Sequence, residues 1–326
     1  MKFTSISKGF AVAALGGLVS LAAVSDQAQA GGHGGWSPKG PINLMIAFTA
    51  GGGADTQARL IASEIEKKKG WKILPSNVTG KGGVTLARKM KSEPNDGQTI
   101  GIAVTESFNY SMAATKNAGY TLNDFTFITT TAGSQMGVYG KTDKGWKSWD
   151  DVVKAAKGDK TIKIGGMSPK HADLIYLLGQ KAGVKFNPVI LRGGKAVLNA
   201  VTAGDVDAGF GAGIQNRAVK AGTMTHYLSG ELTRLKASPN VPTLKEMGLP
   251  YDGGAKFLIF APKGIPADAR VSIAAAVAEA LNTKGTKLSA FVNKAFGGPQ
   301  LITGPALEKL LKDGLESSKA LMKASG

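Results

Sequence analysis

A glycine-rich junction between a strand and a helix is the stretch of this sequence best suited to bind a ligand. The apolar run 41–48 predicts a buried strand, and apolar residues at helical spacing predict a helix over 54–69. Gly51, Gly52 and Gly53 lie where the strand turns into the helix. The first helical turn has backbone N–H groups without partners, and glycines let a ligand oxygen reach them, so the junction can bind an anion. A flexible tight turn without a ligand is the alternative interpretation.

Known motifs for nucleotides, catalysis and metals do not occur in the sequence. Three consecutive glycines lack the spacing of the dinucleotide fingerprint, and Gly80-Lys81 is followed by Gly82 rather than by the Ser or Thr of a phosphate loop. There is no Gly-x-Ser-x-Gly elbow, no His-Glu-x-x-His and no cysteine, so an exported α/β enzyme is a weak alternative. The three histidines are scattered, which argues against a metal site, and we expect no cofactor.

The first 30 residues have the pattern of a signal peptide. Lys2 and Lys8 give a positive end before a short apolar region, 9–24, and Ala28-Gln29-Ala30 fits a small-x-small cleavage site. We expect cleavage after Ala30 and a mature chain outside the cytoplasm. A glycine-rich leader, 31–40, would then begin the mature protein.

The chain carries a formal charge of +17 at pH 7. Such a surplus attracts nucleic acid, anionic lipid or small acids. Export argues against nucleic acid, and the lysines are spread along the chain rather than interleaved with aromatic residues. We therefore interpret most of the lysines as solvated helix faces, with attraction of small anions as the alternative.

Strand and helix patterns alternate along the mature chain, which predicts an α/β fold of parallel sheets with helices on both faces. Two extended runs, 125–131 and 135–141, indicate a crossing into a second lobe, and the run 225–237 is expected to carry the chain back. We expect a first lobe from residues 31–134 and 233–326 and a second lobe from residues 135–232. The other predicted strands are 71–75, 98–104, 161–165, 188–191, 207–211 and 256–262. The other predicted helices are 84–91, 106–116, 149–157, 170–182, 194–203, 215–221, 267–281 and 305–322.

Four motifs, in order along the chain, resemble those of one receptor family. Residues 48–59 resemble a Gly-Gly-x-x-Asp-x-x-Ala-Arg signature, and residues 77–83 resemble an Asn-x-x-Gly-x-Gly-Gly loop. Residues 96–100 resemble an Asp-Gly-x-Thr-hydrophobic turn, and residues 241–248 a Val-Pro-Thr-x-x-Glu-x-Gly segment. Together they are similar to the Bug (TctC-type) extracytoplasmic solute receptors of tripartite tricarboxylate transporters. The similarity extends over nearly the whole mature chain.

The resemblance implies a two-lobed periplasmic binding protein fold, type II-like, with two doubly wound lobes joined by two crossing strands. It implies a periplasmic receptor that closes over a small organic carboxylate and delivers it to the membrane permease subunits of a tripartite tricarboxylate-type transporter. A receptor that presents its ligand to a membrane sensor is the alternative, and we expect a monomer. Carried over by position, the implied ligand-binding residues are Phe48, Thr49, Ala50, Gly51, Gly52, Asp55, Gly80, Lys81, Gly82, Ser134, Ser168, His171, Arg192, Gly193, Gly194 and Asp207.

Four of these residues have competing interpretations. Asp55 is in the first turn of its predicted helix, where a carboxylate is favourable without a ligand, and His171 is in the first turn of another. Lys81 can supply a charge to a second carboxylate of the ligand or can point into solvent. Arg192 ends a predicted strand and precedes two glycines, so its planar fork of donors suits a carboxylate.

Three positions depart from the family pattern. The family usually has proline where this chain has Ala50, a small residue where it has Lys81, and an aromatic residue where it has Leu191. Because these positions shape the implied pocket, the acid itself does not follow from the resemblance. A tricarboxylate, a dicarboxylate, an aromatic acid and an amino acid all stay open.

Overall fold

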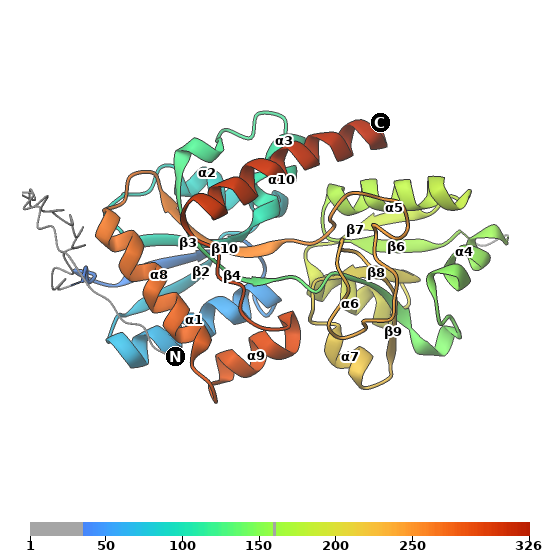
Figure 1. Ribbon diagram of the computed structural model, residues 1–326, viewed down its shortest axis with the longest axis horizontal. Coiled ribbons are helices and arrows are strands. Elements are labelled where there is room, and N and C mark those ends of the chain that lie inside the picture. The colour runs from blue at the N-terminus through green and yellow to red at the C-terminus, as the bar shows by residue number, and fades with distance from the viewer. Residues whose placement is uncertain (1–34, 159–160) are drawn as a thin grey trace, which may run out of the picture. The chain divides into compact units, whose positions relative to one another are not determined.

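The structure is a computed structural model that describes residues 35–158 and 161–326 (Figure 1). The expected signal peptide, its cleavage after Ala30 and residues 31–34 of the glycine-rich leader lie outside the described residues. Gly35–Gly326 form one compact unit. Within the described part of the chain, no helix is both long enough and apolar enough to cross a membrane.

The first sheet has five strands in the order β2-β1-β3-β10-β4. These strands are β1 (Ile42–Ile46), β2 (Ile73–Asn77), β3 (Thr99–Val104), β4 (Phe125–Gly133) and β10 (Lys256–Pro262). β1 runs parallel to β2 and β3, whereas β10 is antiparallel to both β3 and β4. The expectation of wholly parallel sheets is therefore wrong. β4 carries the chain toward the second lobe and β10 carries it back, so the two strands run in opposite directions.

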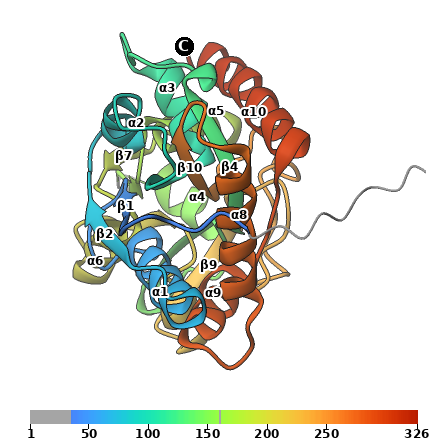
Figure 2. The ribbon, with the colours of Figure 1, turned by 90° about the vertical axis from the view of Figure 1, so that its left-hand side faces the viewer.

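Helices cover both faces of the first sheet (Figures 1 and 2). One face packs against α1 (Gly53–Lys69), α8 (Ala267–Asn282) and α9 (Lys287–Phe296). The other packs against α2 (Val84–Met90), α3 (Tyr110–Ala114) and α10 (Gly304–Ser325). The alternation along β1 explains the two cores, because Leu44 and Ile46 are buried on the α1 side and Met45 on the α2 side.

The second sheet also has five strands, in the order β7-β6-β8-β5-β9. They are β5 (Gly137–Lys141), β6 (Lys163–Gly166), β7 (Asn187–Ile190), β8 (Ala208–Gly211) and β9 (Met224–Ser229). β6 is parallel to β7 and β8, and β5 is antiparallel to β8 and β9. α4 (Trp149–Lys157) and α5 (Pro169–Ala182) contribute to one buried core, and α6 (Gly194–Ala203) to a second. α7 (Asn216–Lys220) follows β8.

The chain passes between the two sheets in two extended segments, one after β4 and one before β10 (Figure 1). Residues 233–252, which the sequence placed in the first lobe, pack with the second sheet. Leu244 and Leu249 are buried in the core of that sheet, and the Ser229 N–H donates to the Pro242 carbonyl at 2.7 Å. The return segment therefore lies directly before Lys256, and the extended run 225–237 supplies the edge strand β9 instead.

Candidate functional site

Three loops that follow parallel strands lie at one edge of the first sheet. Since β1, β2 and β3 are parallel, their carboxyl ends meet at this edge, where open α/β sheets bind ligands. The Asn77 Nδ2 donates to the Phe48 carbonyl at 2.9 Å, which joins the first two loops. The Ser107 Oγ donates to the Gly82 carbonyl at 2.7 Å, which joins the second and third. We call residues 48–53 and 80–83 the cradle.

The buried Asp55 carboxylate links the first cradle loop to Asn77. The Asp55 side chain is 4% exposed, and its carboxylate accepts hydrogen bonds from the Gly51 N–H, the Asn77 Nδ2 and the Arg59 Nε, each at 2.9 Å. Burial alone would raise the pKa of the Asp55 carboxyl, but these hydrogen bonds outweigh it and hold the pKa below its usual range. The carboxylate is therefore ionised and fully engaged within the protein, which favours the structural interpretation of Asp55.

The glycines of the second cradle loop are required by close packing. A Cβ on Gly82 would lie 2.5 Å from the Ser111 Oγ, and one on Gly83 would lie 2.2 Å from the Ser107 Oγ. Both glycines also have positive φ, at 62° and 98°, which side chains rarely adopt. Lys81 lies between them and Gly80, is exposed, and has a φ of 47°. Its ammonium pairs with no carboxylate in the described part of the chain.

The N-terminus of α6 in the second lobe faces the cradle. A Cβ on Gly51 would lie 3.1 Å from the Lys195 Nζ, and a Cβ on Gly193 would lie 4.0 Å from the Thr49 Oγ1. Gly193 is the N-cap of α6 and Gly52 is the N-cap of α1, and neither helix has a side-chain cap. Two helix N-termini therefore meet here, each with first-turn N–H groups and a positive end of the helix dipole.

Two cationic residues lie at or just before the N-terminus of α6. Lys195 is exposed and belongs to the first turn of α6, and Arg192 is exposed and lies two residues before that helix. Neither side chain forms an ion pair with any residue that the structure describes. Backbone donors from two helices, together with unpaired cationic side chains, make this arrangement suited to a carboxylate.

Ser168 and His171 lie after β6, at the start of α5. The Ser168 Oγ is 3.1 Å from the His171 Nδ1, and the imidazole packs against the Phe210 ring with 4.9 Å between centroids. The His171 residue is 1% exposed, and this burial lowers its pKa to about 4, against the opposing effect of the Glu106 carboxylate. The His171 ring is therefore neutral near pH 7. Its Nε2 is buried without a hydrogen bond of ordinary geometry, although the Gly253 backbone lies nearby.

Ser134 and Asp207 lie away from the cradle. Ser134 is in the first crossing segment, where its Oγ donates to the Glu231 Oε1 and accepts from the Ala255 N–H, both at 2.9 Å. Asp207 directly precedes β8, at the opposite edge of the second sheet from the loops that follow β6 and β7. Its carboxylate accepts from the Lys144 Nζ at 2.6 Å and from the Lys163 N–H at 2.9 Å. The structure thus brings neither residue to the cradle.

Comparison with known proteins gives the family. The sequence profile described as "Tripartite tricarboxylate transporter family receptor" (TctC) matches residues 57–326. The chain belongs to the TctC family. A curated relative of this TctC receptor is "UPF0065 protein in gbd 5'region" of Cupriavidus necator, 29% identical over 257 residues that cover 78% of this chain and 77% of the relative.

Solved structures share the fold of this TctC receptor. "MatC (Rpa3494) from Rhodopseudomonas palustris with bound malate" has a TM-score of 0.74 at 22% identity and covers 87% of this chain and 99% of its own. "R. palustris Rpa4515 with adipate" has a TM-score of 0.78 at 21% identity and covers 89% of this chain and 98% of its own. The two-lobed periplasmic binding protein fold is confirmed. TctC proteins are solute-binding receptors rather than enzymes, so the expectation of a non-enzymatic receptor is confirmed as well.

Two residues of the TctC receptor support the cradle without a role assigned from the sequence. Asn77 opens the Asn-x-x-Gly motif, so a signal was present, but its bonds to Phe48 and Asp55 depend on strand pairing. Ser107 follows β3, and only the parallel arrangement of three strands could have placed it beside Gly82.

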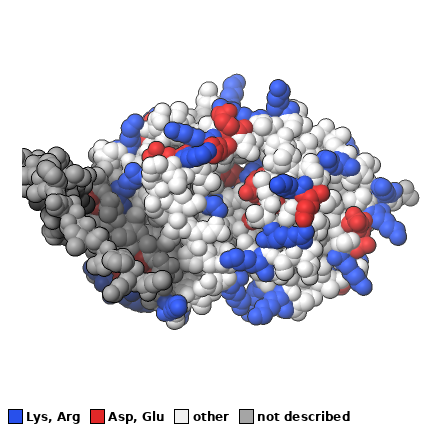
Figure 3. Space-filling model, viewed as in Figure 1, with Lys and Arg blue, Asp and Glu red and all other residues white. Residues whose placement is uncertain are grey.

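The charges of the TctC receptor are dispersed on the face in Figure 3. Lysine and arginine side chains there are interspersed with acidic ones rather than gathered in one continuous patch. Many of the pairs are exposed, such as Lys309 with Asp313 and Lys319 with Glu316. This distribution agrees with solvated helix faces on the side shown. Within the described residues, no group of His, Asp and Glu side chains could hold a metal ion.

Proposed function

We propose that this TctC receptor binds a small organic carboxylate between the cradle and the N-terminus of α6. The main support for this proposal is the proximity of Gly51 and Lys195, since a Cβ on Gly51 would lie 3.1 Å from the Lys195 Nζ. A carboxylate in this position accepts hydrogen bonds from the N–H groups in the first turns of α1 and α6 and lies beside the Lys195 ammonium. Both helix dipoles favour a negative charge there, by about 0.3 to 1 kcal/mol each when exposed and more when partly buried.

The relatives support a carboxylate with more than one acidic group. Two solved structures with this fold are described with malate and with adipate. Each acid has two carboxyl groups, so a ligand of this kind held at the helix N-termini has a second charge to satisfy. Arg192 and Lys81 are the unpaired cations that we assign to this second group, and Arg192 can bind it with a bidentate fork.

The proposed site keeps most of the residues implied by the resemblance and adds Lys195. Ligand contacts are assigned to Phe48, Thr49, Ala50, Gly51, Gly52, Gly80, Lys81, Gly82, Ser168, Arg192, Gly193, Gly194 and Lys195. Asp55 and His171 are assigned positioning roles, because the Asp55 carboxylate accepts three hydrogen bonds from the protein and the His171 ring is buried against Ser168 and Phe210. Ser134 and Asp207 are left out, because their hydrogen bonds lie at the crossing segment and at the far edge of the second sheet.

We propose that the receptor acts in the periplasm and delivers its ligand to the permease of a tripartite tricarboxylate-type transporter. The family description supports the transporter, and the charged start followed by a short apolar run supports export. Mass spectrometry of exported protein is expected to show a chain that begins at Gly31. A chain that retains Met1 would contradict the proposed cleavage.

We propose lobe limits at the two crossing segments. Strand membership supports a second lobe of residues 135–252, with residues up to 134 and residues 256–326 in the first. This differs from the sequence-based limit at 232 because of Leu244 and Leu249. Limited proteolysis is expected to cut within the crossing segments more readily when ligand is absent.

A thermal-shift screen tests the proposed function. Citrate-like tricarboxylates, dicarboxylates, aromatic acids and amino acids are compared at one ionic strength, and the expected result is a rise in melting temperature with a subset of the acids. A ligand at 100 times its dissociation constant adds about 2.7 kcal/mol to the stability of the native state. If no acid raises the melting temperature above the shift given by sodium chloride, the proposal is contradicted.

A further inference from the structure

Tyr110 of the first lobe is buried in the core of the second lobe. It is 3% exposed and belongs to the same buried core as Leu174 and Leu178 of α5, although it begins α3, a helix of the first lobe. Its neighbour Phe108 is buried in a core of the first lobe instead. Leu321, near the end of α10, also lies in the second-lobe core. Two helices of the first lobe, α3 and α10, therefore contact α5 of the second (Figure 1).

A hydrogen bond between the lobes accompanies this packing. The Tyr110 Oη donates to the Asp173 Oδ2 of α5. Among the described residues, the Asp173 carboxylate has no ion pair and no other hydrogen bond. Burial raises the pKa of the Tyr110 hydroxyl, and the bond to Asp173 acts in the same direction, so the hydroxyl stays protonated and donates at neutral pH. Bonds of this kind, from a hydroxyl to a carboxylate, are roughly twice as strong as bonds between neutral groups.

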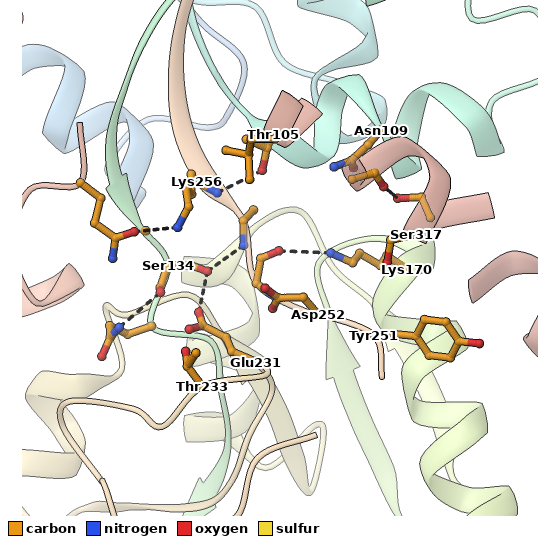
Figure 4. A pocket seen from close by; sticks show the side chains of 18 of the residues that line it. Thr105, Asn109, Ser134, Lys170, Glu231, Thr233, Tyr251, Asp252, Lys256 and Ser317 are labelled. Atoms are coloured by element: carbon orange, nitrogen blue, oxygen red, sulfur yellow. Dashed lines mark hydrogen bonds between the residues drawn. The ribbon is translucent and has the colours of Figure 1, made fainter. Parts of the chain in front are cut away.

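A cavity of about 510 Å³ lies between the lobes beside this contact (Figure 4). Asn109, which directly precedes Tyr110, lines the cavity from the first lobe together with Ser317 of α10. Lys170 of α5 and Tyr251 line it from the second lobe. The cavity interrupts the packing between the lobes. The contacts that remain beside it, the Tyr110 bond among them, therefore have to hold α5 against α3.

The Tyr110 bond joins the two sides of the proposed ligand site. On the first-lobe side, Ser107 lies three residues before Tyr110, and its Oγ donates to the Gly82 carbonyl of the cradle at 2.7 Å. On the second-lobe side, Asp173 lies one turn inside α5, whose N-cap is Ser168. The two crossing segments connect the lobes in every arrangement, whereas this bond exists only while α5 lies against α3. It therefore favours the arrangement of this structure, in which the N-terminus of α6 faces the cradle.

We propose that Tyr110 is a positioning residue for ligand binding, whose hydroxyl holds the second lobe in the arrangement in which α6 faces the cradle. This inference rests on the proposed function, because it concerns the affinity of that same site. Without the hydroxyl, the Asp173 carboxylate loses its donor and is satisfied better when α5 moves away and admits water. The fraction of the protein that is competent to bind then falls, and the affinity falls by the same factor.

Distances between the lobes without ligand give the first test. The chain has no cysteine, so spin labels on cysteines introduced at Ala114 of α3 and Gln180 of α5, both exposed, report the distance between these helices. Tyr110→Phe removes the hydroxyl and retains the ring in the core. Its distance distribution is expected to shift toward longer distances than in the wild type. Tyr176→Phe removes a hydroxyl from a residue of α5 that is 49% exposed, and this matched control is expected to leave the distribution unchanged.

Calorimetry with malate and with adipate gives the second test. For an acid that binds the wild type, Tyr110→Phe is expected to weaken binding at least about fivefold. Asp173→Ala removes the same bond from the other lobe and is expected to weaken binding as well. The double variant should bind no more weakly than the weaker of the two single variants, because both changes remove one and the same bond.

Two results would overturn the inference. The first is a wild-type distance distribution in Tyr110→Phe and in Asp173→Ala, whatever their affinities. The second is additive losses of affinity in the double variant, which would give the two residues separate roles. If Tyr110→Phe does not fold, Asp173→Ala tests the bond from a half-buried position on α5. If neither acid binds the wild type, the proposed function fails for these ligands, and the distances still decide the role of Tyr110.

Discussion

Replacement of Asp55 by asparagine tests how the cradle is held. The carboxylate accepts three hydrogen bonds, from Gly51, Asn77 and Arg59, in a side chain that is 4% exposed. Asparagine retains one acceptor oxygen but places an NH₂ group against a donor. Hydrogen bonds to charged groups contribute about 1.5 to 3 kcal/mol each, and Arg59 can recover part of its bond from water, so we expect Asp55→Asn to cost about 2 to 4 kcal/mol.

In Asp55→Asn, the affinity for the carboxylate ligand is expected to fall together with the free energy of unfolding. The Gly51 N–H is fixed by Asp55, so the loop at the start of α1 loses its anchor, and carboxylate affinity should fall more than tenfold. Urea denaturation gives the free energy of unfolding, and calorimetry gives the affinity. Asp143→Asn is the matched control, because the Asp143 side chain is 66% exposed and has one ion pair, with Lys141 at 2.9 Å. Its expected cost is at most about 1 kcal/mol.

The pH dependence sharpens this test. Because the pKa of Asp55 is lowered in the folded state, its contribution to stability is present above the unfolded pKa and is lost as pH falls through the folded pKa. The difference between wild type and Asp55→Asn should therefore shrink at acidic pH. An Asp55→Asn protein with wild-type stability and no binding would refute the reasoning, since that result requires Asp55 to contact the ligand directly.

Three further predictions concern the ligand cations, the hinge and lobe motion. Arg192→Ala should weaken binding of the true ligand more than tenfold, as measured by calorimetry. Lys81→Ala should weaken the binding only of acids that carry a second or third carboxylate. Equal, small losses of affinity across all acids would assign both cations to the basic surface. The stability advantage of wild type over Glu231→Gln should fall as pH rises from 4.5 through about 7, as measured by urea denaturation. Saturating ligand should lower the radius of gyration in small-angle scattering, and an unchanged profile would argue against closure about the crossing segments.

The sign of the Glu231 effect follows from its burial. Burial raises the pKa of Glu231 to about 7, with Asp252 acting in the same direction and Lys256 against it. This contribution to stability is fully present below the unfolded pKa of 4.5 and is lost as pH rises from there through the folded pKa of about 7, by about 3 kcal/mol in total. His171 and His226, with pKa values lowered to about 4, act in the opposite direction but only below pH 6.5. A wild-type slope retained in Glu231→Gln would contradict the assignment.

Local patterns predicted most of the elements of this fold. α4, α6 and β10 have the predicted limits, and the Ser148 side chain, which accepts from the Asp151 N–H, caps the start of α4. These elements carry their signals in neighbouring residues. α9 was not predicted, although Thr286 caps its start and Gly297 ends it.

The sequence analysis failed where the fold depends on pairing between strands that are distant in the sequence. The insertion of β10 between β3 and β4 depends on contacts more than 100 residues apart, which no local pattern reveals. The edge strand β9 looked like a crossing segment because an extended run is the same in both settings. The two cradle loops were predicted because glycine-rich junctions are local, whereas the position of Asp207 at the far edge depends on the register of β8 against β6.

A crystal structure with the acid selected by the thermal-shift screen tests the central claim most directly. We predict the ligand between Gly51 and Lys195, with a carboxylate oxygen within hydrogen-bonding distance of first-turn N–H groups of α1 or α6. A ligand whose carboxylates contact neither helix N-terminus would contradict the claim that the cradle and α6 together form the receptor site.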